Sequence, residues 1–312
     1  MKDFERIERR ISLHDVRVLM SVIQAGSMGK AARRLATSQP AVSRSIAELE
    51  HVLGVRLLDR SPAGIEPTPY GRALVKRGTA VFDELAQGIK DIQFLADPTA
   101  GKLRIGASIA VAVGFVAAVI DRLSRRYPRL SFDVLAADTR VAYRALADRE
   151  VDLVVAHIVR PITEDTMNAE ILLQDPHVVV AGAQNPWTRR RRIKLADLKN
   201  EQWALPPPDA PYGTVVFEAF RASGLDVPRT VVTSTLPIRS ALLATGRFLS
   251  MVPNVVLQFS PQDRALKGLP IDLPSTVRPL AIVTLKNRTL SPITEVFTNC
   301  ARESARLTEK ER

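Results

Sequence analysis

Three side chains near the N-terminus carry the chemistry needed to read the edges of DNA bases. Gln39, Ser43 and Arg44 fall within one short segment, residues 38–44, whose sequence is SQPAVSR. A glutamine can pair with adenine and an arginine with guanine through two hydrogen bonds each, and a serine hydroxyl can reach bases or phosphates. These residue types at this spacing indicate a nucleic-acid contact, provided that they share an exposed face.

The charge distribution favours the same region, although the total charge does not. The chain has 312 residues and a net charge of +11, but residues 1–100 contain 15 basic and 12 acidic residues. Residues 27–47, in contrast, contain no acidic side chain. A local basic face is a better indicator of nucleic-acid binding than the overall charge. The cations of this segment are Lys30, Arg33, Arg34 and Arg44.

Two short helices must position these side chains. Ser27 precedes the first helix, residues 28–36, and its hydroxyl can cap a free N–H of the first turn. Thr37 or Ser38 then caps a second helix, with Pro40 in its first turn, where a missing N–H costs little. Such a pair predicts a helix-turn-helix whose second helix enters the major groove. The buried stripe of that helix consists of Val42, Ile46, Leu49 and Leu53.

A helical hairpin inside an ordinary domain is the alternative interpretation of this pattern. Two flanking features favour DNA binding instead. Residues 13–23 predict a supporting helix, and residues 53–60 are followed by SPAGIEPTPYG, which predicts a strand, a turn and a short strand. That strand pair would form the wing of a winged helix-turn-helix.

The order and spacing of twenty residues in this region are specific. They are Gly26-Ser27, Ala31-Ala32, Leu35, Ser38-Gln39-Pro40-Ala41-Val42-Ser43, Ile46, Leu49-Glu50, Leu53-Gly54, Leu57, Arg60, Thr68 and Gly71. In these residues the chain resembles the LysR-type transcriptional regulators. Gly29, Leu58 and Ala63 depart from the family, which usually has a hydroxyl residue, a phenylalanine and a basic wing residue there. The resemblance implies DNA contacts from Ser27, Lys30, Arg34, Ser38, Gln39, Pro40, Ser43, Arg44 and Arg60.

The remainder of the chain alternates predicted strands with predicted helices, which indicates an α/β fold with largely parallel sheets. The predicted strands are residues 102–107, 130–136, 151–157, 178–183, 202–205, 230–233, 248–252 and 280–285. The resemblance implies that this region is a two-lobed, periplasmic-binding-protein-like effector domain. The predicted fold class is therefore an α/β C-terminal domain preceded by an all-α winged helix-turn-helix and a long linker helix. The predicted domains are residues 1–68, 69–97 and 98–312, with lobe one at about 101–161 and 268–312 and lobe two at about 162–267.

Residues 69–97 predict one long helix, although Gly78 and Gly88 each weaken it by about 1 kcal/mol. A helix of this length needs a partner for its apolar stripe. Packing on its own domain is one interpretation. The resemblance favours an antiparallel homodimer helix, and dimers of this kind can pair into a homotetramer. The predicted dimerisation residues are Leu74, Val81, Leu85, Ile89 and Ile92.

Polar residues at strand ends predict the ligand-facing positions of the effector domain. Free N–H groups and the positive dipole at a helix N-terminus suit a carboxylate. The resemblance implies a small organic acid as effector, and residues 208–214 are expected to supply the opposite wall. For each hydroxyl, simple helix capping is the alternative. The predicted effector-binding residues are Ser108, Ile109, Asp138, Thr139, His157 and Thr235.

Several other functional classes lack support. The four histidines are scattered, and the single cysteine, Cys300, allows no internal disulfide. The sequence has no phosphate-binding loop, dinucleotide motif or nucleophile elbow. We therefore expect no cofactor, no metal and no catalytic residue. The segment MKDFERIERR lacks the apolar core of a signal peptide, and no apolar run approaches the ~18 residues of a membrane span, so a cytoplasmic location without membrane contact is expected.

The sequence thus predicts a DNA-binding transcriptional regulator that senses a small molecule. A ligand in the cleft would favour one lobe arrangement, and the oligomer would then change its grip on DNA. The expected partners are double-stranded DNA, the effector, further copies of the chain and RNA polymerase. Two alternatives stay open, namely a cytoplasmic solute-binding module with an unrelated helix-turn-helix head, and an enzyme fused to such a head.

Overall fold

The chain forms two compact units, Met1–Gly88 and Ile89–Arg312. The computed structural model describes residues 10–61, 64–162, 165–228, 230–233, 235–259 and 266–310. The division falls inside α5 (Pro69–Ala96) rather than at its C-terminal end, where the sequence predicts a boundary. The last turns of this helix belong with the second unit because Lys90 pairs with Asp152 there, with 3.3 Å between Nζ and Oδ1.

The first unit is a helix-turn-helix with a two-stranded wing. Val42, Ile46 and Leu49, from the stripe predicted for the second helix, are 1–2% exposed and pack against the two preceding helices. The wing strands pair antiparallel, and the predicted wing residue Ala63 lies outside the described residues. The elements are α2 (Leu13–Ala25), α3 (Met28–Arg34), α4 (Gln39–Leu53), β1 (Leu58–Ser61) and β2 (Gly64–Pro67).

Short polar residues and glycines fix where these helices begin and end. Ser27 and Ser38 each accept a hydrogen bond from a first-turn N–H, of Lys30 and Ala41 respectively, so the predicted cap at Ser27 is confirmed and Ser38 is the second cap. Gly54 ends α4 with a φ of 70°, the left-handed conformation that glycine adopts without strain.

The start of α5 is locked to the first unit by close packing. The Thr68 hydroxyl donates to the carbonyl of Arg56 at 2.8 Å and accepts from the N–H of Gly71 at 3.1 Å. A Cβ on Gly71 would lie 2.1 Å from the carbonyl oxygen of Leu57. Only glycine therefore fits at this position, which explains two of the motif residues in physical terms.

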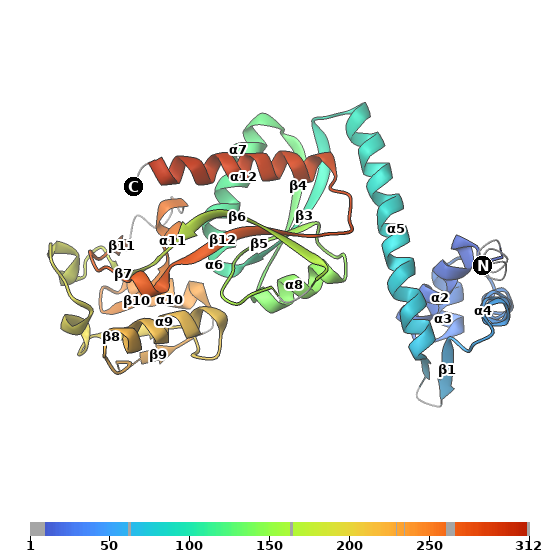
Figure 1. Ribbon diagram of the computed structural model, residues 1–312, viewed down its shortest axis with the longest axis horizontal. Helices are drawn as coiled ribbons and strands as arrows, with labels where there is room; N and C mark the ends of the chain where they lie inside the picture. Colours follow the sequence, from blue (N-terminus) through green and yellow to red (C-terminus); the bar gives the residue numbers. More distant parts are fainter. Residues whose placement is uncertain are drawn as a thin grey trace. The chain divides into compact units, whose positions relative to one another are not determined.

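Lobe one of the second unit is built on a mixed sheet in the order β4-β3-β5-β12-β6. β3, β4 and β5 are parallel, and β12 runs antiparallel to both β5 and β6. Helices α7 and α12 cover one face of this sheet and α8 covers the other (Figure 1). Its elements are β3 (Ala100–Ser108), α6 (Ile109–Val111), the π-helical η1 (Ala112–Val116), α7 (Ala117–Arg126), β4 (Arg129–Ala137), α8 (Thr139–Ala147), β5 (Leu153–His157), β6 (Met167–Asp175), β12 (Arg278–Leu285) and α12 (Pro292–Lys310).

Lobe two has a second mixed sheet in the order β11-β7-β10-β8-β9. Trp203 is fully buried at the centre of its core, with its ring edge-on to Phe220. Its elements are β7 (His177–Gly182), η2 (Pro186–Arg189), η3 (Leu195–Leu198), β8 (Gln202–Leu205), α9 (Pro211–Ala222), β9 (Thr230–Val232), α10 (Leu236–Ala244), β10 (Phe248–Pro253), α11 (Asn254–Phe259), β11 (Leu266–Gly268) and η5 (Pro274–Thr276).

Two predicted lobe boundaries are wrong. The sequence places the end of the first part of lobe one at residue 161, but β6 completes the lobe-one sheet, so the chain crosses at Pro176. The sequence begins the second part at residue 268, but β11 and the apolar residues up to Leu273 pack in lobe two. Both errors have the same cause. The observed boundaries depend on β6 and β11, and the sequence pattern predicts neither strand. The sheets are also mixed rather than largely parallel.

The two crossover segments are joined to each other. The backbone N–H of His177, after the first crossover, donates to Oγ1 of Thr276, before the second, at 3.0 Å. Both residues are buried. None of the helices in the described part of the chain combines the length and hydropathy that a bilayer span requires.

Candidate functional site

The predicted base-reading residues lie on the N-terminal half of α4. Gln39, Pro40 and Arg44 are exposed, and Ser43 is half-buried beside the buried Val42. Gly29 of α3 faces Gln39, since a Cβ there would lie 3.5 Å from the Gln39 Oε1, an ordinary van der Waals distance. The side chains thus stand on the outer face of a helix whose other face is fixed in the core.

The remaining predicted DNA-contacting residues surround this helix in sequence. Lys30 and Arg34 are exposed on α3, Lys30 in its first turn and Arg34 at the end that leads into the turn before α4. Ser27 and Ser38 are the two helix caps, so each has a structural role whether or not it meets a phosphate. Arg60 lies on β1, where it pairs with Ile65 of β2.

An apolar stripe runs along α5 and is open to solvent. Val81, Leu85, Ile89 and Ile92 are between 44% and 69% exposed and recur at spacings of four, four and three residues. Leu74, the fifth predicted dimerisation residue, instead packs against the core of its own unit. Exposed apolar side chains at this spacing form one continuous face of a helix.

A cavity of about 250 Å³ lies between the lobes of the second unit. Five of the six predicted effector-binding residues line it. The segment predicted as the opposite wall contributes Ala210, Pro211 and Tyr212. The five are Ser108, Ile109, Asp138, Thr139 and Thr235.

Ser108 is buried under a side chain from the other lobe. The Tyr212 hydroxyl of α9 lies 2.6 Å from Ser108 Oγ and 3.0 Å from His157 Nδ1. His157 Nε2 lies 2.8 Å from Asp175 Oδ2. Burial raises the pKa of Tyr212, so the phenol keeps its proton. These contacts join Ser108, Tyr212, His157 and Asp175 in one chain of hydrogen bonds.

The other polar cavity residues differ in how they are engaged. Asp138 caps α8 by accepting from the N–H of Arg140 at 2.9 Å, and it is half-buried. Thr235 begins α10 without a side-chain cap and is exposed. The simple capping interpretation therefore describes Asp138 but not Thr235.

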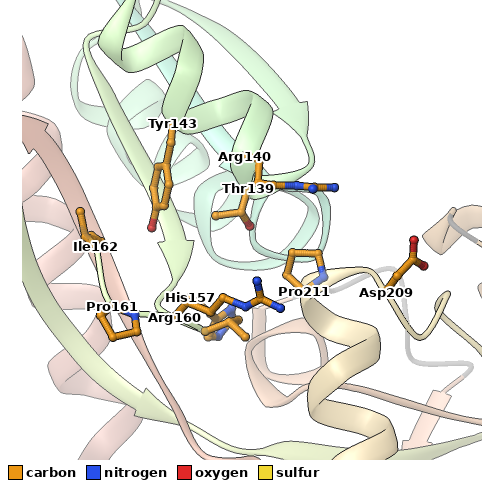
Figure 2. Close-up of a pocket in the computed structure, with 10 residues that line it drawn as sticks. Thr139, Arg140, Tyr143, His157, Arg160, Pro161, Ile162, Asp209 and Pro211 are labelled. Carbon is orange, nitrogen blue, oxygen red and sulfur yellow. The ribbon is translucent and has the colours of Figure 1, made fainter. Parts of the chain in front are cut away.

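A second, smaller cavity of about 190 Å³ adjoins the first, since both are lined by Thr139 and Pro211. His157, the sixth predicted effector residue, lines this one. Figure 2 shows Thr139 and Tyr143 projecting from α8, with Pro211 at the start of α9. Across the space, Arg160 belongs to the segment that follows β5.

Comparison with known proteins agrees with both halves of this structure. The family model "Bacterial regulatory helix-turn-helix protein, lysR family" matches residues 13–72, and "LysR substrate binding domain" matches residues 96–306. The chain belongs to the LysR family. It is accordingly a LysR-type DNA-binding transcriptional regulator with an effector-binding domain. LysR-type regulators are not enzymes, which removes the fused-enzyme alternative.

Individual relatives of this LysR-type chain extend over nearly its whole length. The transcriptional regulator TdcA of Escherichia coli K12 is 25% identical over 294 residues, covering 92% of this chain and 91% of TdcA. GbpR of Azospirillum brasilense is 26% identical over 288 residues, covering 92% and 84%.

Two solved structures share the fold of this LysR-type chain. A full-length OxyR variant of Pseudomonas aeruginosa aligns with a TM-score of 0.65 at 24% identity, covering 95% of each chain. Full-length CbnR, solved in complex with its target DNA, aligns with a TM-score of 0.55 at 20% identity, covering 95% of this chain and all of that one.

Two polar cavity residues of this LysR-type regulator, His177 and Arg239, were not predicted from the sequence as binding residues. One signal for Arg239 is present in the sequence. Leu236, Arg239 and Leu243 recur at spacings of three and four on the buried face of α10, so a cation interrupts an apolar stripe. His177 carries no comparable local signal, because it reaches the cavity only through the packing of the two lobes.

Proposed function

We propose that this LysR-type regulator reads its operator through the outer face of α4. Gln39 and Arg44 would pair with base edges in the major groove, and Ser43 would contact a base or a phosphate. Ser27, Lys30, Arg34, Ser38, Pro40 and Arg60 would hold phosphates or support the helix. The observation that carries this proposal is the exposure of Gln39 and Arg44 above a buried stripe.

The working species would be a homodimer joined through α5, with two dimers pairing into a homotetramer. The exposed stripe on α5 supports this assembly, because Val81, Leu85, Ile89 and Ile92 lack cover. Linking two DNA-binding modules raises the effective concentration of the second at a partly palindromic site.

The effector would be a small organic acid bound in the cavity between the lobes. The size of the cavity, about 250 Å³, supports a small molecule, and its position supports a response, since residues of both lobes line it. A ligand that binds one lobe arrangement more tightly shifts the population toward that arrangement. RNA polymerase is the further partner on which the DNA-bound oligomer would act.

The test is a footprint on DNA upstream of the regulator's own gene, with affinities measured over a range of salt concentrations. Substituting Gln39→Ala or Arg44→Ala is expected to weaken binding by about 1–3 kcal/mol, because each removes a bidentate base contact. Arg125→Ala is the control, since Arg125 is an exposed cation on α7 of the effector domain. If Arg125→Ala weakened binding as much as Arg44→Ala, α4 would not be the reading helix.

A further inference from the structure

Arg239 is a buried cation on the wall of the larger cavity. It is 8% exposed, and its Nη1 donates to the backbone carbonyl of Thr233 at 3.1 Å. Its Nε has no hydrogen-bond partner, and no carboxylate among the described residues forms an ion pair with it. Burial lowers the pKa of Arg239. A buried charge without a counter-charge raises the free energy of the folded protein. An anion bound beside this guanidinium would remove part of that cost.

His177 lines the same cavity, and one of its ring nitrogens lacks a hydrogen-bond partner. Its Nδ1 lies 3.3 Å from the carbonyl oxygen of Thr276, and because a carbonyl only accepts, Nδ1 must carry the proton. Burial lowers the pKa of His177 to about 3, which keeps the ring neutral. Its Nε2 is therefore a lone-pair acceptor, it is buried, and it has no partner among the described residues. Such an acceptor requires a donor.

The rest of the lining limits the ligand. Most of the cavity surface is apolar, and a volume of about 250 Å³ corresponds to roughly eight water-sized groups. Asp138 stands on the same lining as a carboxylate, which disfavours a second anionic group on the ligand. The Ser108 hydroxyl is already hydrogen-bonded to Tyr212, whereas Arg239 has a free donor and a full charge for an anion. Apolar contact comes from Ile109, Leu236, Met251 and the prolines at 206, 207 and 253.

We propose that the effector is a small hydroxy monocarboxylic acid, with its carboxylate on Arg239 and its hydroxyl donating to His177 Nε2. This inference rests on the proposed function, because it names the ligand of the cavity assigned there. The sequence predicts that helix N-termini hold the carboxylate of the effector. In this inference the buried guanidinium of Arg239 holds it instead.

The experiment is a calorimetric titration of the full-length protein with matched sets of small acids. Each set contains a hydroxy acid, its deoxy counterpart and its amino counterpart. The first set is lactate, propionate and alanine, and the second is α-hydroxybutyrate, butyrate and α-aminobutyrate. The third set is α-hydroxyisovalerate, isovalerate and valine. β-Hydroxybutyrate and lactamide complete the panel. We expect at least one hydroxy acid to bind about tenfold more tightly than its deoxy counterpart. The deoxy acid has no hydroxyl and therefore leaves His177 Nε2 without a donor.

Two variants separate the roles of the two residues. Arg239→Gln is expected to weaken every acid by about 10- to 150-fold, as for loss of a charged hydrogen bond. His177→Phe keeps a planar ring but removes the Nε2 acceptor. This variant is expected to bind the hydroxy and deoxy acids with equal affinity. Arg239→Lys, which retains the charge, serves if Arg239→Gln does not fold, and it should bind acids more tightly than any neutral replacement that folds.

Several results would overturn the inference. They are no binding by any acid at millimolar concentration, tighter binding of amino acids than of hydroxy acids, or unchanged affinity in Arg239→Gln. A footprint with and without the acid distinguishes this inference from the proposed function. If the acid binds through Arg239 but the footprint does not change, the ligand assignment stands and the regulatory response fails.

Discussion

The hydroxyl of Tyr212 lies 2.6 Å from the hydroxyl of Ser108, although the two residues belong to different lobes. Tyr212 comes from α9 of lobe two, and Ser108 ends β3 of lobe one. The same hydroxyl also reaches His157, at the end of β5. One side chain therefore connects lobe two to two neighbouring strands of lobe one, at the floor of the cavity proposed for the effector.

Replacing this hydroxyl should loosen the contact between the lobes. Tyr212→Phe leaves Ser108 and His157 Nδ1 buried without their partner, so we expect the free energy of unfolding to fall by about 1–3 kcal/mol. Urea unfolding followed by tryptophan fluorescence measures this change, because both tryptophans, Trp187 and Trp203, lie in the effector domain. Tyr70→Phe is the matched control, since Tyr70 is 60% exposed. Equal effects in the two variants would contradict the assigned role.

The buried His177 should make the effector domain less stable in mild acid. Burial lowers its pKa from 6.5 to about 3. Below pH 6.5 the unfolded chain binds a proton at this site and the folded chain does not, so stability falls as the pH falls. Between pH 7 and pH 5 the loss for this one group is about 2 kcal/mol. The unfolding free energy is measured for the wild type and for His177→Phe at both pH values. Its loss from pH 7 to pH 5 should be larger in the wild type by about 2 kcal/mol. Parallel curves would show that His177 is not the source.

Asp152 should stabilise the effector domain far more than a surface carboxylate does. Burial alone would raise its pKa, but hydrogen bonds from Arg104 and the charge of Lys90 hold the pKa well below its usual range. Its Oδ1 also lies 2.8 Å from Nη2 of Arg288, which is 1% exposed at its side chain. Asp152→Asn removes the buried negative charge that Lys90, Arg104 and Arg288 share, at a cost of about 3–5 kcal/mol.

The matched control for Asp152 is Asp133→Asn. Asp133 pairs with Lys102 on the surface, where both side chains are about 60% exposed, and such pairs contribute little. We expect Asp133→Asn to leave the urea midpoint within experimental error. A loss at Asp152 no greater than that at Asp133 would mean that the buried ion cluster is not stabilising.

The open stripe on α5 predicts the oligomeric state. Leu85→Lys places a charge in the middle of the stripe, where Leu85 is 49% exposed, and is expected to give monomers with weaker operator binding. Sedimentation of the wild type and the variant provides the measurement. Lys76→Glu is the control, because at 100° per residue it lies about 180° around the helix from Leu85. Dimers that persist in Leu85→Lys would exclude the stripe as the interface.

The helix-turn-helix is the part of the fold that the sequence predicts best. Its determinants are local, since Ser27 and Ser38 cap helices a few residues away and Val42, Ile46 and Leu49 repeat along a single helix. Caps and short periodic stripes are patterns that a linear sequence displays directly. The bounds of α3 and α4 accordingly differ from the predicted ones by only a few residues.

The lobe boundaries depend on pairing that is not local. β6 has the sequence MNAEILLQD, an edge strand whose polar residues interrupt its apolar pattern. Its place in the sheet comes from β12, more than a hundred residues later in the chain. A strand of this kind acquires its identity from its partner, so the sequence assigned it to the wrong lobe.

The cavity shows the same division between local and distant information. Ser108, Asp138 and Thr235 stand at predicted strand or helix ends, and all three line it. The residues with unsatisfied polar groups, His177 and Arg239, reach it from separate segments of lobe two. Their unpaired atoms appear only after burial and neighbours are known, which no periodicity encodes.

The hydrogen bond between His177 and Thr276 has a mechanical consequence. Because it fastens one interlobe connection to the other, the connections cannot move apart without depriving a buried amide of its acceptor. The pair therefore behaves as one pivot, which permits lobe two to tilt but resists sliding of the two halves. A ligand that changes the lobe arrangement would then act by changing the angle between the two lobes.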